Sequence, residues 1–276
     1  MSIASAPMNP VLIRMITAAV LLAVFFPAVL LAPAWLWALL VSAAIMVGAH
    51  EWARLSQFPG SLPVVYAALV GLIALGLSFL PGADAQVVQA ALFVLAAAFW
   101  VVLAPLWLAF GWQGRAVFIR AAIGLTVLLP TWAAILYLRD AGPWVLIGIM
   151  AIVWIADSAA YFSGRAFGRR KLAPHISPGK TWEGVAGALL ALLLYGVLMN
   201  GFQSVVSLPL LLLMIVVLFY FSVLGDLFES WIKRVAGMKD SGRLLPGHGG
   251  VLDRIDAMTS ALPIAAGMLV LLGRGA

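Results

Sequence analysis

The chain contains no cysteine and only three histidines, and just 9% of its 276 residues are charged. The absence of cysteine excludes disulfide bonds, thiolate metal sites and cysteine nucleophiles. A soluble domain usually has about a quarter of its residues charged, so the scarcity of charge argues against a soluble globule. Because 65% of the residues are hydrophobic, the composition predicts a polytopic membrane protein.

The sequence contains a series of apolar runs. The length of each run is close to the roughly 20 helical residues that cross a bilayer. The runs are continuous rather than alternating, which favours helices over a β-barrel. The first run could be a signal peptide, but the second follows so soon that a helical hairpin is favoured. We predict an all-α protein with about nine transmembrane helices, at residues 12–31, 34–53, 62–81, 87–110, 116–138, 143–163, 182–201, 207–229 and 256–273.

The basic residues are distributed unevenly along these runs. If nine helices cross the membrane, fourteen of the sixteen Lys and Arg residues fall on one side, and only Arg139 and Arg274 on the other. The positive-inside rule then places the amino terminus and two long polar loops in the cytoplasm. The carboxyl terminus is predicted to lie outside.

The polar chemistry is also unevenly distributed. We predict that residues 1–140 are amino-terminal transmembrane helices and that residues 141–276 form a catalytic transmembrane region with two cytoplasmic loops. In a soluble protein the net charge of +6 would suggest nucleic acid. Here it fits loops that face anionic lipid headgroups. Membrane lipids are therefore the expected partners, and nucleic acid is not.

Four aspartates carry the predicted site. Asp157 lies inside the sixth run, and an ionisable residue in a membrane helix is a functional candidate, although a salt-bridged structural role stays open. Asp226 lies near the end of the eighth run, and Asp253 and Asp256 are three residues apart at the predicted start of the ninth helix. Carboxylate oxygens are preferred ligands of Mg²⁺. We predict a metal site of Asp226, Asp253 and Asp256; the alternative is acidic residues stabilising a first helical turn.

Cations surround these carboxylates in the sequence. Lys233, Arg234, Lys239 and Arg254 come from the same region, and Lys180 comes from the other long loop. Carboxylates, a metal ion and several cations together fit a polyphosphate substrate. The alternative, that basic loops merely follow the positive-inside rule, explains their sign but not the interleaved aspartates.

The stretch "PGHGG" adds backbone freedom to this region. Gly249 and Gly250 allow backbone amides to approach an anion closely, and His248 could donate to a phosphate. A bare turn remains the alternative.

The stretch "SPGKTWEG" contains Gly-Lys-Thr but is not a P-loop. Pro174 stands where the first glycine of that motif is required, and no strand is expected before it. Ser177, Lys180 and Thr181 could still bind phosphate at the start of the seventh helix. His50 and Glu51, at the end of the second run, are interpreted as membrane-interface residues rather than site residues.

The stretch "SWIKRVAGMKDSGRLLPGHGGVLDRID" resembles the signature of the phosphatidate cytidylyltransferases, also called CDP-diacylglycerol synthases. The shared framework is Ser230, Lys233, Arg234, Lys239, Asp240, Pro246, His248, Gly249, Gly250, Asp253, Arg254 and Asp256. The upstream "ADSAAYFSGRAFGRRKLAPHISPGKTWEG" and "GDLFES" are similar to the same family. The strong resemblance covers residues 154–256, whereas the amino-terminal half matches only as membrane helices.

The resemblance implies transfer of a cytidylyl group from CTP to phosphatidic acid, with Mg²⁺ required, a second monovalent or divalent cation left open, and a homodimer. It also implies a bacterial inner-membrane enzyme with a cytoplasmic active site. The catalytic residues are expected to be Lys239, Asp240, His248, Asp253 and Arg254. Substrate-binding residues are expected to be Asp157, Ser177, Lys180, Thr181, Lys233, Arg234, Gly249 and Gly250.

Two other classes were weighed. An ion- or proton-coupled transporter could use Asp157 and Asp226 as intramembrane ligands, but transport predicts polar groups along a path to both faces. Another phospholipid-synthesis enzyme, such as a CDP-alcohol phosphotransferase, needs a compact Asp, Gly, Ala and Arg cluster that the sequence does not contain.

The orientation can be tested with reporters fused to the carboxyl terminus. Nine crossings with a cytoplasmic amino terminus place this end outside, so a reporter active only outside the cytoplasm should be active. A carboxyl-terminal reporter found in the cytoplasm would contradict the nine-helix count.

Overall fold

The computed structural model describes residues 10–114, 116–202 and 206–273. Arg115 and Arg274, which entered the charge distribution, lie outside the described residues. The helices are α1 (Pro10–Leu31), α2 (Ala34–Leu55), α3 (Leu62–Leu77), α4 (Gly82–Ala98), the π-helical turn η1 (Phe99–Leu103), α5 (Ala104–Phe110), α6 (Val117–Ala141), α7 (Pro143–Phe167), α8 (Trp182–Phe202), α9 (Leu208–Val235), α10 (Leu252–Ile255) and α11 (Met258–Leu271).

The predicted helical architecture is confirmed for the described residues. Each predicted apolar run becomes a helix, and the fourth becomes α4, η1 and α5 in succession. Within the described residues, seven helices are long and apolar enough to cross a membrane, while α3 and α11 are shorter, with 16 and 14 residues. The protein is therefore an integral membrane protein by the length and composition of its helices.

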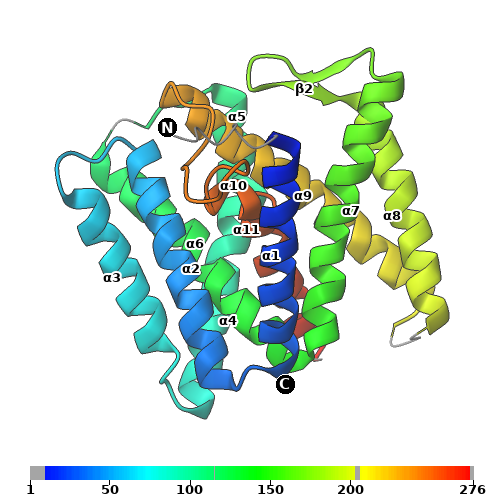
Figure 1. The fold of residues 1–276 in the computed structure, drawn as a ribbon. Helices are drawn as coiled ribbons and strands as arrows, with labels where there is room; N and C mark the ends of the chain where they lie inside the picture. Colours follow the sequence, from blue (N-terminus) through cyan, green and yellow to red (C-terminus); the bar gives the residue numbers. More distant parts are fainter. Residues whose placement is uncertain (1–9, 115, 203–205, 274–276) are drawn as a thin grey trace, which may run out of the picture.

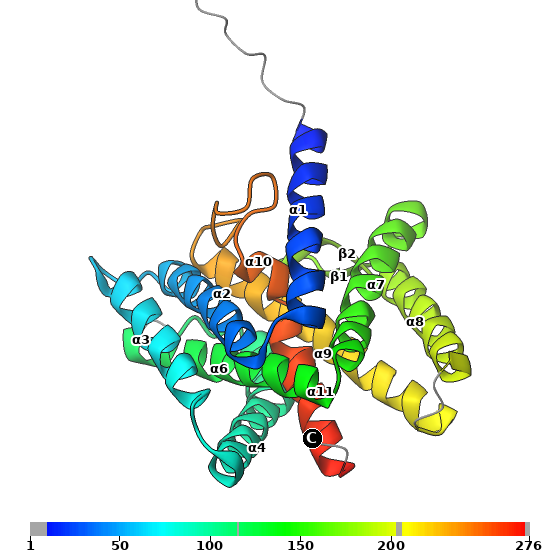
Figure 2. The same ribbon diagram turned by 60° about the horizontal axis from the view of Figure 1, so that its bottom comes forward.

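Two pairs of helices that follow each other in the sequence pack along one another, and α11 lies among several other helices. α7 packs along α8 and α2 along α3, while α11 contacts α4, α6 and α9. α9 crosses the bundle obliquely (Figure 1) and packs against α8 and α11. Figure 2 shows α1 standing in front, between α2 on one side and α7 on the other.

The loop between α7 and α8 contains an unpredicted antiparallel hairpin. Strand β1 (Lys171–Ala173) pairs with β2 (Ser177–Thr181), with Lys171 opposite Thr181 and Ala173 opposite Ser177. The expectation that no strand precedes Pro174 was therefore wrong, although this two-stranded ribbon is not the parallel strand of a P-loop fold. The phosphate-binding candidates Ser177, Lys180 and Thr181 lie on β2 rather than in a helix.

Two helix boundaries near the carboxyl end also differ from prediction. α9 continues to Val235, beyond the predicted end at residue 229, so Lys233 and Arg234 are helical. Asp253 and Asp256, predicted to lie together at the start of the ninth helix, are separated by a break: α10 ends at Ile255, Asp256 and Ala257 form a turn, and α11 begins at Met258. Residues 236–251 between α9 and α10 are called the polar loop below.

A cluster of aromatic rings around Phe228 holds α9 in place. The ring of Phe228 is stacked 6.5 Å from Trp52 and lies edge-on to Phe99, Trp100 and Trp107 at 5.3, 5.5 and 5.9 Å. Phe228 is only 1% exposed. Because Phe228 lies between Asp226 and Glu229, its packing sets the rotation of the helix that carries both acids.

Replacing Phe228 with alanine tests this packing. Removing a buried phenyl ring costs about 3–5 kcal/mol of unfolding free energy, so F228A should unfold at a clearly lower temperature in detergent. Leu213 on the same helix is 59% exposed, and L213A is the matched control with little expected change. Equal melting temperatures for F228A and the wild type would contradict the proposed anchoring.

Candidate active site

Three helices and the hairpin line a cavity of about 420 Å³. Asp157 of α7, Lys180 of β2 and Asp226 of α9 contribute charged groups to its wall. The Lys180 ammonium lies 2.6 Å from Oδ2 of Asp226, and the Ser230 hydroxyl donates to Oδ1 of Asp226 over 3.2 Å. A partly exposed ion pair therefore joins the hairpin to α9 at the cavity.

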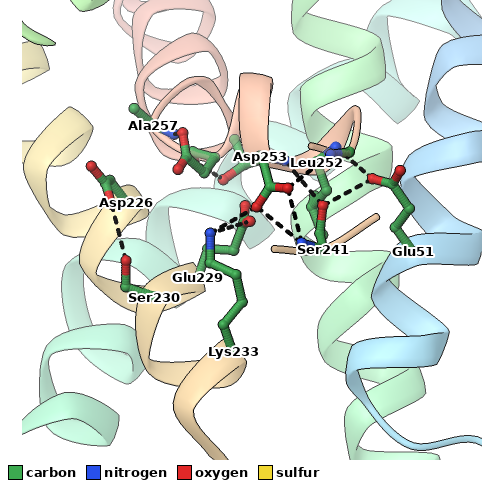
Figure 3. A network of polar contacts seen from close by, with 12 residues as sticks. Glu51, Asp226, Glu229, Ser230, Lys233, Ser241, Leu252, Asp253 and Ala257 are labelled. Carbon is green, nitrogen blue, oxygen red and sulfur yellow. Dashed lines mark hydrogen bonds and ion pairs between the residues drawn. The ribbon is translucent and has the colours of Figure 1, made fainter. Parts of the chain in front are cut away.

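A second charged cluster surrounds Lys233 of α9 (Figure 3). The ammonium lies 3.1 Å from Oε1 of Glu229, one helical turn earlier, and 2.9 Å from Oδ1 of Asp253. The three side chains are only 11%, 5% and 6% exposed, in the order Lys233, Glu229 and Asp253. A buried charge is stable only when it is paired, so Lys233 is what permits two carboxylates to lie here.

Asp253 is held by several donors at once. The Gly250 amide donates to Oδ2 over 2.8 Å, and the Ser241 amide donates to the same oxygen over 2.9 Å. Burial opposes ionisation, but the Lys233 ammonium and these amides outweigh it and lower the pKa of Asp253. Gly249 has φ +86° and lies so close that a Cβ there would come 2.6 Å from Oδ2 of Asp253.

Asp256 lies in the turn between α10 and α11, facing α9. Its Oδ1 accepts a hydrogen bond from the Ala257 amide at 2.7 Å. Burial raises the pKa of Asp256 to about 8, and the charge of Asp226 adds to the shift. The backbones approach closely, since a Cβ on Gly225 would come 2.8 Å from the Asp256 carbonyl oxygen. Asp226 and Asp256 are thus electrostatic neighbours across this contact.

The donor set suits a hard cation only in part. Among residues 10–114, 116–202 and 206–273, no three His, Asp or Glu side chains are grouped closely enough to hold a metal ion by themselves. Asp253 has its oxygens occupied by Lys233 and backbone amides. Asp226, although bonded by Lys180 and Ser230, is partly exposed at the cavity, and Asp256 lies near it across the close backbone approach at Gly225. Mg²⁺ is commonly bound by one or two carboxylates together with substrate phosphates and water, so this pair fits such an ion.

The other predicted catalytic residues lie toward the surface. Lys239, Asp240 and Arg254 are exposed. His248 is half-buried, and within the described part of the chain its Nδ1 has no hydrogen-bond partner. Lys239, Asp240 and Arg254 are therefore accessible to a ligand, whereas Nδ1 of His248 is a buried polar atom.

The predicted substrate-binding residues on the hairpin and at the end of α9 differ in whether they line the cavity. Arg234 donates from Nε to the Ile176 carbonyl over 3.2 Å, which ties the hairpin to α9. Thr181 is buried, and its Oγ1 accepts from the Gly184 amide at 3.1 Å in the first turn of α8. Ser177 lines the cavity. Arg234 therefore shapes the site from outside, while Ser177, Lys180 and Thr181 line its cavity.

Comparison with known proteins agrees with this arrangement. Residues 12–272 match the model of the cytidylyltransferase family. The chain belongs to this family. A phosphatidate cytidylyltransferase of Pseudomonas aeruginosa is 42% identical over 95% of this chain and 98% of its own length. Similar proteins of that name from Haemophilus influenzae and Brucella suis are 44% and 47% identical, over 52% and 46% of this chain and 55% and 46% of their own lengths.

Membership of the cytidylyltransferase family confirms the resemblance seen in the sequence. The match covers the amino-terminal helices as well as the signature region. The amino-terminal half also contributes to the site, through a residue that sequence analysis misjudged.

Glu51 was predicted to be a membrane-interface residue, and this prediction was wrong. Glu51 is 4% exposed, and its carboxylate accepts hydrogen bonds from Ser241 Oγ and from the amides of Val251 and Leu252. The criterion that selected Asp157, an acid within an apolar run, could have selected Glu51 too. Its position near the end of a run led to the wrong interpretation.

The Lys233 cluster predicts a large stability effect. K233M leaves Glu229 and Asp253 buried without their cation, and breaking a buried pair on one side costs about 3–5 kcal/mol. SDS titration in mixed micelles should show earlier unfolding, and the double variant E229Q/K233M should recover part of the loss. Lys171 on β1 is exposed, so K171M is the control. Equal unfolding of K233M and K171M would contradict the assignment.

Proposed function

We propose that this protein transfers the cytidylyl group of CTP to phosphatidic acid, releasing CDP-diacylglycerol and pyrophosphate. One observation carries the proposal: 42% identity over nearly the full length of both chains to a protein named phosphatidate cytidylyltransferase. The clustered acids and cations beside a cavity support the same chemistry, because a triphosphate requires charge neutralisation.

The cavity suits a reaction between a water-soluble and a lipid substrate. It opens among membrane helices α7, α8 and α9, and it ends at the polar hairpin. A phosphatidate headgroup can enter beside these helices while CTP approaches from water. We place the site on the cytoplasmic face of a bacterial inner membrane, where the basic loops are expected, and propose a homodimer as the working assembly.

Asp226 and Asp256 are the residues proposed to hold Mg²⁺. When bound, the ion neutralises the triphosphate and stabilises charge that develops during transfer. Asp157, which lines the same cavity, is the carboxylate available to a second, monovalent or divalent cation. Asp253, predicted as a third ligand, is proposed instead to position the polar loop, because its side chain is only 6% exposed and each of its oxygens accepts two hydrogen bonds. Asp226 also has partners, but it is 24% exposed and lines the cavity, where a substrate-bound ion can reach it.

The chain's own cations complete the proposed mechanism. A phosphatidate oxygen attacks the α-phosphorus of CTP, the bond to the β-phosphate bridging oxygen breaks, and pyrophosphate leaves. The attacking phosphate is already anionic near neutral pH, so no general base is required. Lys180, Lys239 and Arg254 stabilise the phosphate charge, and His248 donates a hydrogen bond to it.

The remaining predicted residues have supporting roles in this proposal. Asp240 orients Lys239 at the start of the polar loop. Ser177 binds phosphate from β2, and the Gly249 backbone bends around the ligand. Lys233 acts through its ion pairs rather than by touching substrate.

The transporter alternative is not supported. Its two proposed intramembrane ligands, Asp157 and Asp226, both line the cavity beside the hairpin. The family membership and the full-length relative point to nucleotidyl transfer instead.

The proposal is tested with purified protein in detergent, labelled CTP, phosphatidate and Mg²⁺. Wild-type protein should move label into the lipid fraction and release pyrophosphate. D226N and D256N should each lower kcat by about 100-fold or more, equivalent to about 2.7 kcal/mol of transition-state stabilisation.

The matched control is D84N, because Asp84 is an exposed acid in the first turn of α4. Its rate should equal that of the wild type. Near-normal transfer by both D226N and D256N would remove the metal assignment, and absence of any lipid product from the wild type would overturn the proposed function.

A further inference from the structure

The polar loop and the start of α10 are hydrogen-bonded to Glu51, a residue from the amino-terminal half of the chain. Glu51 near the end of α2 is separated from its partners by 190 to 201 positions in the sequence. Its Oε2 accepts from the Leu252 amide at 2.8 Å and from Ser241 Oγ at 3.1 Å, and its Oε1 accepts from the Val251 amide at 3.1 Å. One carboxylate therefore bonds both ends of the loop segment from residue 241 to residue 252.

The fit around this carboxylate is tight. A Cβ on Gly242 or on Gly250 would collide with the Glu51 carboxylate. Two glycines thus let the loop backbone close around the acid, and any other residue would force them apart. A contact so closely enclosed on two sides has little freedom to move, which is the property required of a group that holds a site in register.

The contacts continue from Glu51 to the charged cluster. Ser241 Oγ, which donates to Glu51, also accepts from the Asp253 amide at 3.3 Å. Asp253 in turn accepts from Lys233 at 2.9 Å. Figure 3 shows this continuous series from α2 through the loop to α9. The location of α10, and with it Arg254 and Asp256, therefore depends on both α9 and α2.

We propose that Glu51 is a positioning residue for cytidylyl transfer, which holds the polar loop and the start of α10 in the geometry that the reaction needs. The inference rests on the proposed function. Glu51 touches neither substrate nor metal ion; it acts through Ser241, Val251 and Leu252. It also gives the amino-terminal helices a part in the reaction.

The central variant is E51Q, which keeps the size of the side chain. It replaces one acceptor oxygen with an NH₂ donor, and that donor faces the amide N–H or hydroxyl donors of the loop. Misplacement of catalytic groups by about 1 Å can cost about 100-fold in rate. We expect kcat per folded enzyme to fall on that scale, while the KM values for CTP and phosphatidate change much less. E51D, which is one methylene shorter, should not restore kcat.

The matched control is S42A on the same helix. Ser42 is 4% exposed, and its Oγ accepts a hydrogen bond from Trp132 Nε1 at 3.0 Å, away from the loop. S42A also removes a buried hydrogen bond of α2. Its melting temperature should fall, but its kcat per folded enzyme should stay at the wild-type value. A purely structural role of Glu51 would make E51Q behave in the same way as S42A.

Trypsin provides a readout that does not require the reaction. Lys239 and Arg243 in the loop are exposed, and loss of buried hydrogen bonds should make cleavage there roughly tenfold faster in E51Q. S42A should be cut at the wild-type rate. If E51Q fails to fold, S241A removes the hydroxyl contact alone and should show the same two effects in weaker form.

The outcomes separate this inference from the proposed function. Lowered kcat together with faster loop cleavage in E51Q, with S42A unchanged in both, supports the positioning role. Wild-type kcat in E51Q overturns it, whatever the cleavage rate, and so does an unchanged cleavage rate. If the wild type forms no CDP-diacylglycerol, the proposed function fails and the reaction role of Glu51 fails with it, while the cleavage comparison still shows whether Glu51 orders the loop.

Discussion

The buried ammonium of Lys233 is the interaction on which the carboxyl-terminal half depends. Taking two carboxylates and one cation out of water is costly unless each is closely paired. Lys233 is within 3.1 Å of both Glu229 and Asp253, and the remaining negative charge on Asp253 is met by the amides of Ser241 and Gly250. This arrangement holds α10 against α9, so the turn at Asp256 is placed by a charge balance as well as by apolar packing.

α9 connects this cluster to the cavity. Asp226, Glu229 and Lys233 are spaced three and four residues apart, so they rise along neighbouring positions of the same helix surface. Asp226 meets Lys180 of the hairpin, while Lys233 meets Asp253 beyond the polar loop. The oblique course of α9 lets one helix serve both partners (Figure 1). Phe228, enclosed by aromatic rings, holds these acids at a constant rotation.

Lipid exposure explains how much of the fold could be predicted. A backbone in hydrocarbon must satisfy its own hydrogen bonds, so an apolar run has one available structure, and each predicted run is helical. The polar segments have no such constraint. The pairing of Lys171 with Thr181, the extension of α9 to Val235 and the break at Asp256 depend on tertiary contacts. The partners of Glu51 could not be predicted for the same reason, since they lie about 200 positions away.

Gly249 and Gly250 of the polar loop have a structural role that the sequence did not predict. Their backbone freedom was expected to serve a substrate phosphate. In the structure, Gly242 and Gly250 make room for Glu51, and Gly249 makes room for Asp253. The first anions that these glycines accommodate are therefore carboxylates of the protein. Internal acids accept the bonds of the loop amides, whereas Lys239 of the loop and Arg254 of α10 are exposed. A triphosphate can therefore meet these two cations without competing for the amides that hold the loop in place.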